Sequence, residues 1–186
     1  MVAQRLSVVV PALNEASAIR AALEALAPLR ARGHEVIVVD GGSSDDTVRI
    51  AQALTDKVIH AQRGRALQMN AGARAASGDV LLFLHADTRV PPGADALIPT
   101  AFLWGRFDVR IDGTHPLLKL VACAMNLRSR LTGIATGDQA IFVRRDAFPG
   151  FPEIPLMEDV AFCKQMKPLA APTCLRERVV TSGRRW

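Results

Sequence analysis

The sequence predicts an α/β fold: a single domain with a mostly parallel central sheet that is flanked by helices. Three observations support this prediction. Short, nearly continuous apolar runs alternate with helical patterns through the first half of the chain. β-branched residues dominate these runs, which is typical of strands that are covered on both faces. The connections are short, and 186 residues suffice to bury one substantial core.

The first half of the chain is expected to run in strand–helix order. Apolar residues recur at helical spacing in the first helix, which we expect Pro28 to end. Ser44 is expected to cap the start of the second helix, and Gly78 the end of the third. The expected strands are 6–10, 36–39, 57–60 and 80–84, and the expected helices are 15–27, 44–54 and 65–77.

The second half is less regular. Three prolines predict a loop over 148–155, and an apolar stripe predicts an amphipathic helix over 117–131. That stripe either faces a lipid acceptor or packs in the core. The remaining expected elements are helices at 93–103 and 158–167 and strands at 106–111, 140–143 and 179–180. We find no repeat or linker, so residues 1–186 are treated as one domain.

Charge and composition limit the classes of partner. A net charge of +5 and a pI near 9.7 favour anionic partners, such as a diphosphate substrate or an acidic membrane surface. Nucleic acid is not expected, because the chain has no tyrosine and no nucleic-acid-binding signature. Cys123, Cys163 and Cys174 lack the spacing of a metal site and are expected to be reduced thiols.

The sequence also bears on location. No apolar stretch approaches 18 residues, and the first residues lack the regions of a signal peptide. We therefore expect a cytoplasmic protein, with peripheral contact at the inner face of the membrane left open by the basic charge.

Polar side chains follow the predicted strands at their carboxyl ends, where parallel sheets bind ligands. These are Asn14 and Glu15 after the first strand, Asp40 after the second, and His85 with Asp87 after the fourth. His85 and Asp87 are two residues apart, so both can face one side and hold a divalent cation that carries a diphosphate. An imidazole ligand favours manganese over magnesium. The alternative is an aspartate that only caps a turn.

Two other acidic positions have two readings each. Asp40 precedes Gly41 and Gly42, whose conformational freedom allows close approach of a ligand, so its carboxylate either binds a base or ribose or opens an Asx turn. Glu158 and Asp159 open a helix after the proline-rich loop. They either stabilise the helix start or supply a general base that deprotonates an acceptor hydroxyl.

Arginines are candidate partners for phosphate, because a guanidinium group grips phosphate oxygens in a bidentate manner. The candidates are Arg63, Arg65, Arg184 and Arg185, with an ordinary surface role as the alternative. The glycine-rich signatures of P-loop NTPases and of dinucleotide-binding dehydrogenases are absent, and so is the G-x-S-x-G elbow of α/β hydrolases.

Five short motifs occur in a fixed order along the chain. They are Leu6–Glu15 (LSVVVPALNE), Val36–Thr47 (VIVVDGGSSDDT), Gly64–Gly72 (GRALQMNAG), Leu82–Thr88 (LFLHADT) and Met157–Asp159 (MED). With a weaker match over Thr181–Trp186, this order resembles the bacterial family 2 glycosyltransferases. The resemblance runs from Leu6 to about Lys167.

The resemblance implies a GT-A, Rossmann-like fold and an inverting transfer from a nucleoside-diphosphate sugar, which we expect to be uridine-linked. It also implies a divalent metal, Mn²⁺ or Mg²⁺. Residues 1–90 would form the nucleotide-binding half and residues 91–186 the acceptor-binding half. The acceptor could be a lipid, a glycan or a small molecule.

The same resemblance assigns residues to the donor site. It implies that Pro11 and Glu15 line the nucleotide pocket and that Asp40 holds the base. Arg65 would lie near the base or phosphate, and Asn70 would steady that helix. Asp87 would ligate the metal. We include the neighbouring Asn14, Gly41, His85 and Ala86 as candidates.

On the acceptor side, the resemblance implies that Asp159 is the catalytic base, with Glu158 beside it. Asp138 lies in a turn similar to the acceptor-side loop of bacterial members. Arg184 and Arg185, with Trp186, resemble a short form of the family's Q-x-x-R-W element, which touches the diphosphate and the acceptor.

Two departures from the family pattern leave alternatives open. His85 stands where the family's D-x-D element has its first acid, which leaves the identity of the metal open. The chain stops at Trp186, where many relatives continue, so we expect a shortened C-terminus: either the sequence is truncated or its acceptor contacts lie elsewhere. A non-catalytic nucleotide-sugar-binding module fits these departures. A sugar-phosphate nucleotidyltransferase fits less well, because its glycine-rich basic loop is missing at Pro11–Glu15.

Overall fold

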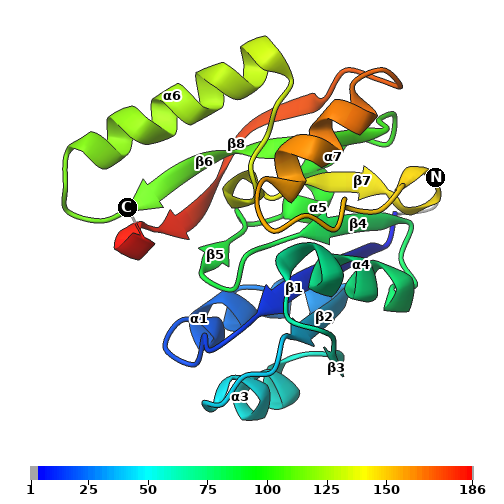
Figure 1. Ribbon diagram of the computed structural model, residues 1–186, viewed down its shortest axis with the longest axis vertical. Coiled ribbons are helices and arrows are strands. Elements are labelled where there is room, and N and C mark those ends of the chain that lie inside the picture. The colour runs from blue at the N-terminus through cyan, green and yellow to red at the C-terminus, as the bar shows by residue number, and fades with distance from the viewer. Residues whose placement is uncertain (1–3, 186) are drawn as a thin grey trace.

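The computed structural model describes residues 4–185 and confirms the predicted α/β fold (Figure 1). The described strands form one eight-stranded sheet in the order β3-β2-β1-β4-β7-β6-β8-β5. The strands are β1 Leu6–Ala12, β2 Glu35–Asp40, β3 Lys57–His60, β4 Val80–Phe83, β5 Thr88–Arg89, β6 Trp104–Asp112, β7 Phe142–Arg144 and β8 Thr173–Ser182. Four of the seven pairings are parallel, so the sheet is mostly parallel, as predicted.

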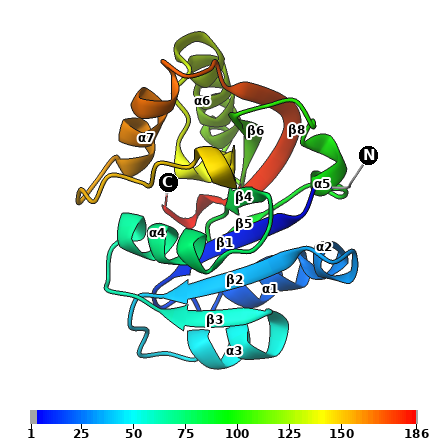
Figure 2. The ribbon, with the colours of Figure 1, turned by 90° about the vertical axis from the view of Figure 1, so that its right-hand side faces the viewer.

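Helices cover both faces of this sheet (Figure 2). They are α1 Ile19–Glu24, α2 Ala27–Ala31, α3 Thr47–Leu54, α4 Arg65–Ala75, α5 Ala94–Leu97, α6 Leu117–Thr132 and α7 Glu158–Met166, with short 3-10 turns η1 Gly137–Gln139, η2 Arg145–Ala147 and η3 Gly183–Arg185. None of the helices described over residues 4–185 is long and apolar enough to cross a bilayer.

Alternation along the central strands separates two cores. Val8 and Val10 of β1 belong to the cluster that includes Ile19 of α1, whereas Val9 belongs to the cluster that includes Ala73 of α4 and Phe162 of α7. Successive side chains of a strand point to opposite faces, so a strand that is apolar throughout must be covered twice. This arrangement leaves the carboxyl ends of β1, β2 and β4 open at one edge.

Three local predictions in the first half were wrong. The helix expected over 15–27 is two helices, α1 and α2, and Pro28 lies in the first turn of α2, where its missing N–H costs nothing. Ser44 does not cap α3, which begins at Thr47. Gly78 does not end α4; it lies against β1, where a Cβ would come within 2.6 Å of the Arg5 carbonyl oxygen.

The second half departs further from prediction. The helix expected over 93–103 is a single turn, and the strand expected over 140–143 runs over Phe142–Arg144. The strands expected at 106–111 and 179–180 are longer, because they pair with each other in parallel along their lengths as β6 and β8. The two-residue strand β5, which pairs with β8, was not predicted. These pairings join segments far apart in the sequence, which local patterns do not reveal.

Candidate active site

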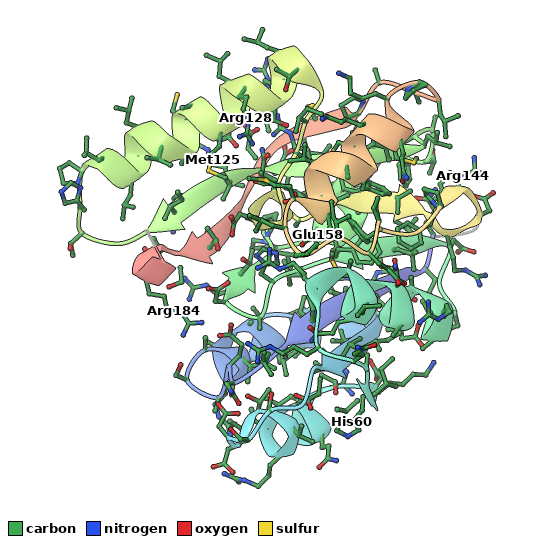
Figure 3. All side chains as sticks on the ribbon, viewed as in Figure 1. His60, Met125, Arg128, Arg144, Glu158 and Arg184 are labelled. Carbon is green, nitrogen blue, oxygen red and sulfur yellow. The ribbon has the colours of Figure 1, made fainter. Side chains whose placement is uncertain are left out.

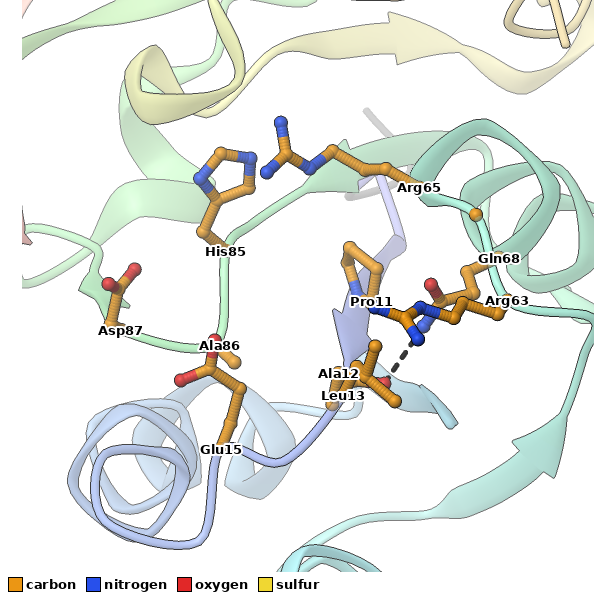
Figure 4. Close-up of a pocket in the computed structure, with 11 residues that line it drawn as sticks. Pro11, Ala12, Leu13, Glu15, Arg63, Arg65, Gln68, His85, Ala86 and Asp87 are labelled. Atoms are coloured by element: carbon orange, nitrogen blue, oxygen red, sulfur yellow. Dashed lines mark hydrogen bonds between the residues drawn. The ribbon is translucent and has the colours of Figure 1, made fainter. Parts of the chain in front are cut away.

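A cavity of about 260 Å³ opens where the end of β1, the loop after β4 and the start of α4 meet (Figure 4). It contains six of the predicted donor-site residues and the phosphate candidate Arg63. Its lining consists of Pro11, Ala12, Leu13, Glu15, Arg63, Gly64, Arg65, Gln68, His85, Ala86 and Asp87. The sequence therefore located the edge of the sheet that holds the largest cluster of candidate residues.

The α4 side of the cavity is cationic. Arg63 and Arg65 flank Gly64, whose φ of +147° is a conformation that side-chain-bearing residues rarely adopt. This turn aims the chain into α4, so the first residues of the helix line the cavity. A helix start with unpaired N–H groups and two guanidinium groups suits an anionic ligand.

The opposite side is acidic and is bridged by an arginine from the C-terminal end. Arg184, in η3, forms an ion pair with Glu15 and lies 3.5 Å from an oxygen of Asp87. Its other terminal nitrogen donates to Ser17 Oγ at 3.1 Å. Figure 3 places Arg184 beside this edge of the molecule. The carboxylates of Glu15 and Asp87 thus approach one common cation.

His85 pairs with a carboxylate that the sequence assigned to the acceptor side. Its Nδ1 lies 3.3 Å from Asp138 Oδ1, which also accepts a hydrogen bond from Thr181 Oγ1 at 3.3 Å. Burial acts to raise the pKa of Asp138. The hydrogen bond and charge of His85, with smaller contributions from Thr181 and Arg65, outweigh burial and lower that pKa. The structure thus brings Asp138, from the second half of the chain, into contact with His85.

The other ring nitrogen of His85, Nε2, is buried without a hydrogen-bond partner among residues 4–185. It packs against Gly137, where an added Cβ would lie 2.3 Å away. With Nδ1 facing Asp138 and Nε2 buried, His85 offers no accessible nitrogen to an ion at Asp87 in this conformation. Gly137 is therefore the residue that makes room for the imidazole.

The start of α7 adjoins this region. Glu158 Oε1 lies 3.4 Å from an Arg65 nitrogen, and Asp159 accepts hydrogen bonds from the N–H groups of Gly137 (2.8 Å) and Val160 (2.7 Å). Both carboxyls are buried. With Arg65 and His85 they line a small enclosed space behind the main cavity. The two backbone hydrogen bonds fix the orientation of the Asp159 carboxylate at this space.

Asp40 does not line the cavity. Its carboxylate accepts hydrogen bonds from the N–H groups of Gly42 (3.0 Å) and Ser43 (3.1 Å), and it lies 3.3 Å from Nδ1 of His60. Burial acts to raise its pKa, but hydrogen bonds from Ser43, Gly42 and His60 outweigh burial and lower it. The structure shows the Asx turn that was one of its two expected roles.

Three further donor-site candidates lie behind the cavity wall. Asn14, with a φ of 54°, accepts a hydrogen bond from the Ser44 N–H at 2.9 Å. Gly41 packs against Gln68: a Cβ added at position 41 would lie 3.0 Å from the side-chain amide carbon of Gln68. Asn70 exchanges two hydrogen bonds with the backbone of Phe151, at 2.9 and 2.7 Å. Asn70 therefore ties α4 to the proline-rich loop.

Sequence reasoning missed Gln68. Its buried amide donates to the carbonyl oxygens of Ala12 (2.9 Å) and Val39 (2.8 Å), which hold the ends of β1 and β2 together beneath the cavity. The signal was available, since Gln68 lies inside the Gly64–Gly72 motif. Arg185 lies in η3, but its side chain and all of Trp186 fall outside the described part of the chain.

Within residues 4–185, no group of three His, Cys, Asp or Glu side chains could hold a metal ion unaided. A magnesium or manganese ion that is shared with a diphosphate needs only one or two carboxylates from the protein. Asp87, whose side chain is 7% exposed and faces the cavity, meets that requirement. These residues thus fit a metal ion that binds together with the nucleotide diphosphate better than a metal ion that the protein holds by itself.

Comparisons with curated proteins give relatives of known family. The chain is 35% identical over 115 residues to the PGL/p-HBAD biosynthesis glycosyltransferase of Mycobacterium bovis, an alignment that covers 58% of this chain and 44% of that protein. It is 35% identical over 94 residues to glucosyl-3-phosphoglycerate synthase of Mycobacterium tuberculosis, covering 44% and 28%. The chain thus spans less than half the length of these relatives.

Solved structures share the fold. Staphylococcus aureus TarS, in complex with UDP-GlcNAc, superposes with a TM-score of 0.75 at 22% identity, over 97% of this chain and 59% of that one. Glucosyl-3-phosphoglycerate synthase from Mycobacterium tuberculosis, with Mn²⁺, UDP and glucosyl-3-phosphoglycerate, gives 0.68 at 19%, over 94% and 70%. The sequence model of glycosyl transferase family 2 matches residues 7–113. The chain therefore belongs to glycosyl transferase family 2.

Proposed function

We propose that the protein transfers a sugar from a nucleoside-diphosphate sugar to an acceptor hydroxyl with inversion at the anomeric carbon. The cavity at the ends of β1 and β4 carries the proposal, because it sets Arg63 and Arg65 opposite Glu15 and Asp87. UDP in the complexes of two structural neighbours supports uridine diphosphate as the donor nucleotide, and GDP-mannose in a third keeps guanine open.

In this proposal, residues 1–90 bind the donor and residues 91–186 bind the acceptor. The diphosphate lies against the start of α4, where Arg63, Arg65 and the free N–H groups of the helix neutralise it. Gln68 keeps the ends of β1 and β2 at fixed separation below the nucleotide. Each of these groups is preorganised by the sheet edge, which limits the reorganisation that donor binding requires.

Asp87 would hold a divalent cation together with the donor diphosphate. Such a cation, when bound, neutralises charge that develops on the departing nucleoside diphosphate. Arg184 already lies at the carboxylates of Glu15 and Asp87, so it is placed to contact the same diphosphate oxygens. Mn²⁺ in two structural neighbours supports this assignment.

Asp159 is the proposed catalytic base. The acceptor oxygen attacks the anomeric carbon as its proton passes to Asp159, and the bond from that carbon to the diphosphate breaks with its electron pair leaving on the nucleotide. Glu158 holds Arg65, and Asp138 holds His85, so these two acids position the groups around the reacting centre.

Two substitutions test the proposal. Asp87→Ala should abolish metal-dependent stabilisation by UDP in thermal-shift measurements, and sugar transfer with it. Asp159→Asn should keep that stabilisation but lower the turnover number by about 10²–10⁴-fold, the usual contribution of a general base. Asp146→Asn is the matched control, because Asp146 is an exposed carboxylate outside both cavities.

Near-wild-type turnover in either variant would remove the role given to that residue. Binding of UDP with manganese, without turnover of any donor in the wild-type protein, would instead identify a nucleotide-sugar-binding module. A panel of UDP- and GDP-sugars, with and without manganese, separates these outcomes and identifies the base.

A further inference from the structure

Helix α6 turns an apolar stripe toward solvent. Leu117, Leu120, Leu127 and Leu131 are 57, 66, 55 and 76% exposed, and Ala124 between them is exposed too. Their spacing of three or four residues, with one step of seven between Leu120 and Leu127, places them in one line along the helix. In Figure 3, side chains on the outer side of α6 project away from the rest of the protein.

This stripe is not the face that packs in the core. The buried residues of α6 are Ala122, Met125 and Ser129, which lie on the opposite side of the helix. Asn126 anchors the helix to β6, because its side-chain amide accepts from the Val109 N–H at 2.8 Å and donates to the Val109 carbonyl at 3.0 Å. The helix is therefore held in place while a second apolar face remains outside.

The charges along α6 are all basic. Lys119, Arg128 and Arg130 lie on the helix, which contains no aspartate or glutamate. At about 100° of rotation per residue, Lys119 and Arg130 fall on one flank of the stripe and Arg128 on the other. Arg130 donates to Asp108 at 2.8 Å, whereas Lys119 and Arg128 are exposed. A leucine stripe between basic flanks is typical of a helix that lies in a membrane interface.

We propose that α6 docks the protein on an anionic phospholipid bilayer. The leucines would enter the region between headgroups and acyl chains, while Lys119 and Arg128 extend to the lipid phosphates. A second copy of this helix fits less well. Two paired stripes would bring only cations together at their flanks, where paired helices normally place opposite charges. The net charge of +5 favours the anionic surface.

Vesicle flotation of the whole chain tests this inference. The protein should float with phosphatidylglycerol-containing vesicles at low salt, and should float less at high salt and with pure phosphatidylcholine. The double variant Leu120→Glu/Leu127→Glu should lower the partition coefficient by roughly tenfold or more, and Lys119→Glu/Arg128→Glu should lower it on anionic vesicles by a similar factor. Leu169→Glu, a 66% exposed leucine outside α6, should bind like the wild type.

Circular dichroism melting should be unchanged in all three variants, because every substituted side chain is exposed. The UDP thermal shift should be unchanged too, because none of these residues lines the donor cavity. Failure of the donor proposal would thus leave the vesicle result intact. Wild-type flotation of the Leu120→Glu/Leu127→Glu variant would overturn the inference. A second result would also overturn it: the wild type fails to float with anionic vesicles, and light scattering shows a dimer that the Leu120→Glu/Leu127→Glu variant abolishes.

Discussion

The two halves of the chain contribute different kinds of side chain to the two shared cores. In residues 4–90, the strands β1, β2 and β4 are buried runs of valine, isoleucine and leucine that pair in parallel. Residues 91–185 contribute more aromatic rings to these cores, and six of the seven phenylalanines lie there. Phe151 and Phe162, for example, have ring centroids 4.8 Å apart.

The difference shows in how each half positions its polar groups. In the first half, Glu15, His85 and Asp87 follow directly after strands, so the local pattern places them at one edge. In the second half, Asp138 and Asp159 reach the site only through contacts between distant segments. The candidate site lies where the halves meet, and the Arg65–Glu158 and His85–Asp138 pairs join its two sides.

Among the changes that test this difference between the halves, the largest effect is expected at Glu35, a buried carboxylate of the first half. Burial acts to raise its pKa, but hydrogen bonds from Lys57, Ser7 and Ser77 and the charge of Lys57 lower it from the ordinary 4.5 to about 2. A carboxyl whose pKa is lower in the folded state than in the unfolded state stabilises the fold at every pH above its unfolded-state pKa. About 3 kcal/mol of the free energy of unfolding should therefore be lost as the pH falls from about 4.5 to about 2.

Urea denaturation across this pH range measures that loss. Glu35→Gln should lower stability by about 2–3 kcal/mol at neutral pH and flatten the acid dependence. The exposed Glu24→Gln, which removes an i,i+4 pair with Arg20, should change it by less than about 0.5 kcal/mol. Equal acid dependence in the Glu35→Gln variant and the wild type would show that other carboxyls dominate.

A smaller effect is expected at Gly137, where the halves meet. A Cβ there would lie 2.3 Å from His85 Nε2, so Gly137→Ala should displace the imidazole and the adjoining Asp159 contact. We expect turnover to fall by about 100-fold, the cost of misplacing a group by about an ångström. Steady-state kinetics with the donor found in the nucleotide panel measures this.

The double variant Gly137→Ala/His85→Ala separates strain from function. Removing the imidazole relieves the overlap, so its melting temperature should return toward that of the wild type while turnover stays low. Full recovery of turnover in the double variant would show that His85 has no positioning role.

The smallest effect is expected at Asn70, which ties α4 in the first half to the proline-rich loop in the second. Asn70→Ala leaves the N–H and carbonyl of Phe151 buried without their side-chain partner, at a cost of about 2 kcal/mol. Gln52→Ala, at an exposed position of α3, should change stability by less than about 0.5 kcal/mol. If the two variants have the same melting temperature, the hydrogen bonds between Asn70 and Phe151 do not contribute measurably to stability.

Much of the first half could be predicted from the sequence. Strands β1 to β4 were expected within two residues of their observed ends, because each contains a compact apolar run that local periodicity reveals. The long pairing of β6 with β8 could not be predicted, since it depends on partners that are far apart in the chain. For the same reason, the sequence did not reveal that Asp138 pairs with His85 or that Gln68 braces the strand ends.

The sequence by itself determined the α/β class, the order of the family motifs and the sheet edge at which Glu15, His85 and Asp87 gather. These follow from local periodicity and from the rule that parallel strands end at one edge. The tertiary structure alone decided which contacts those residues make and which apolar face of α6 is buried. Periodicity shows that a helix has an apolar face, but only packing decides whether that face lies inside, and the leucine stripe of α6 lies outside.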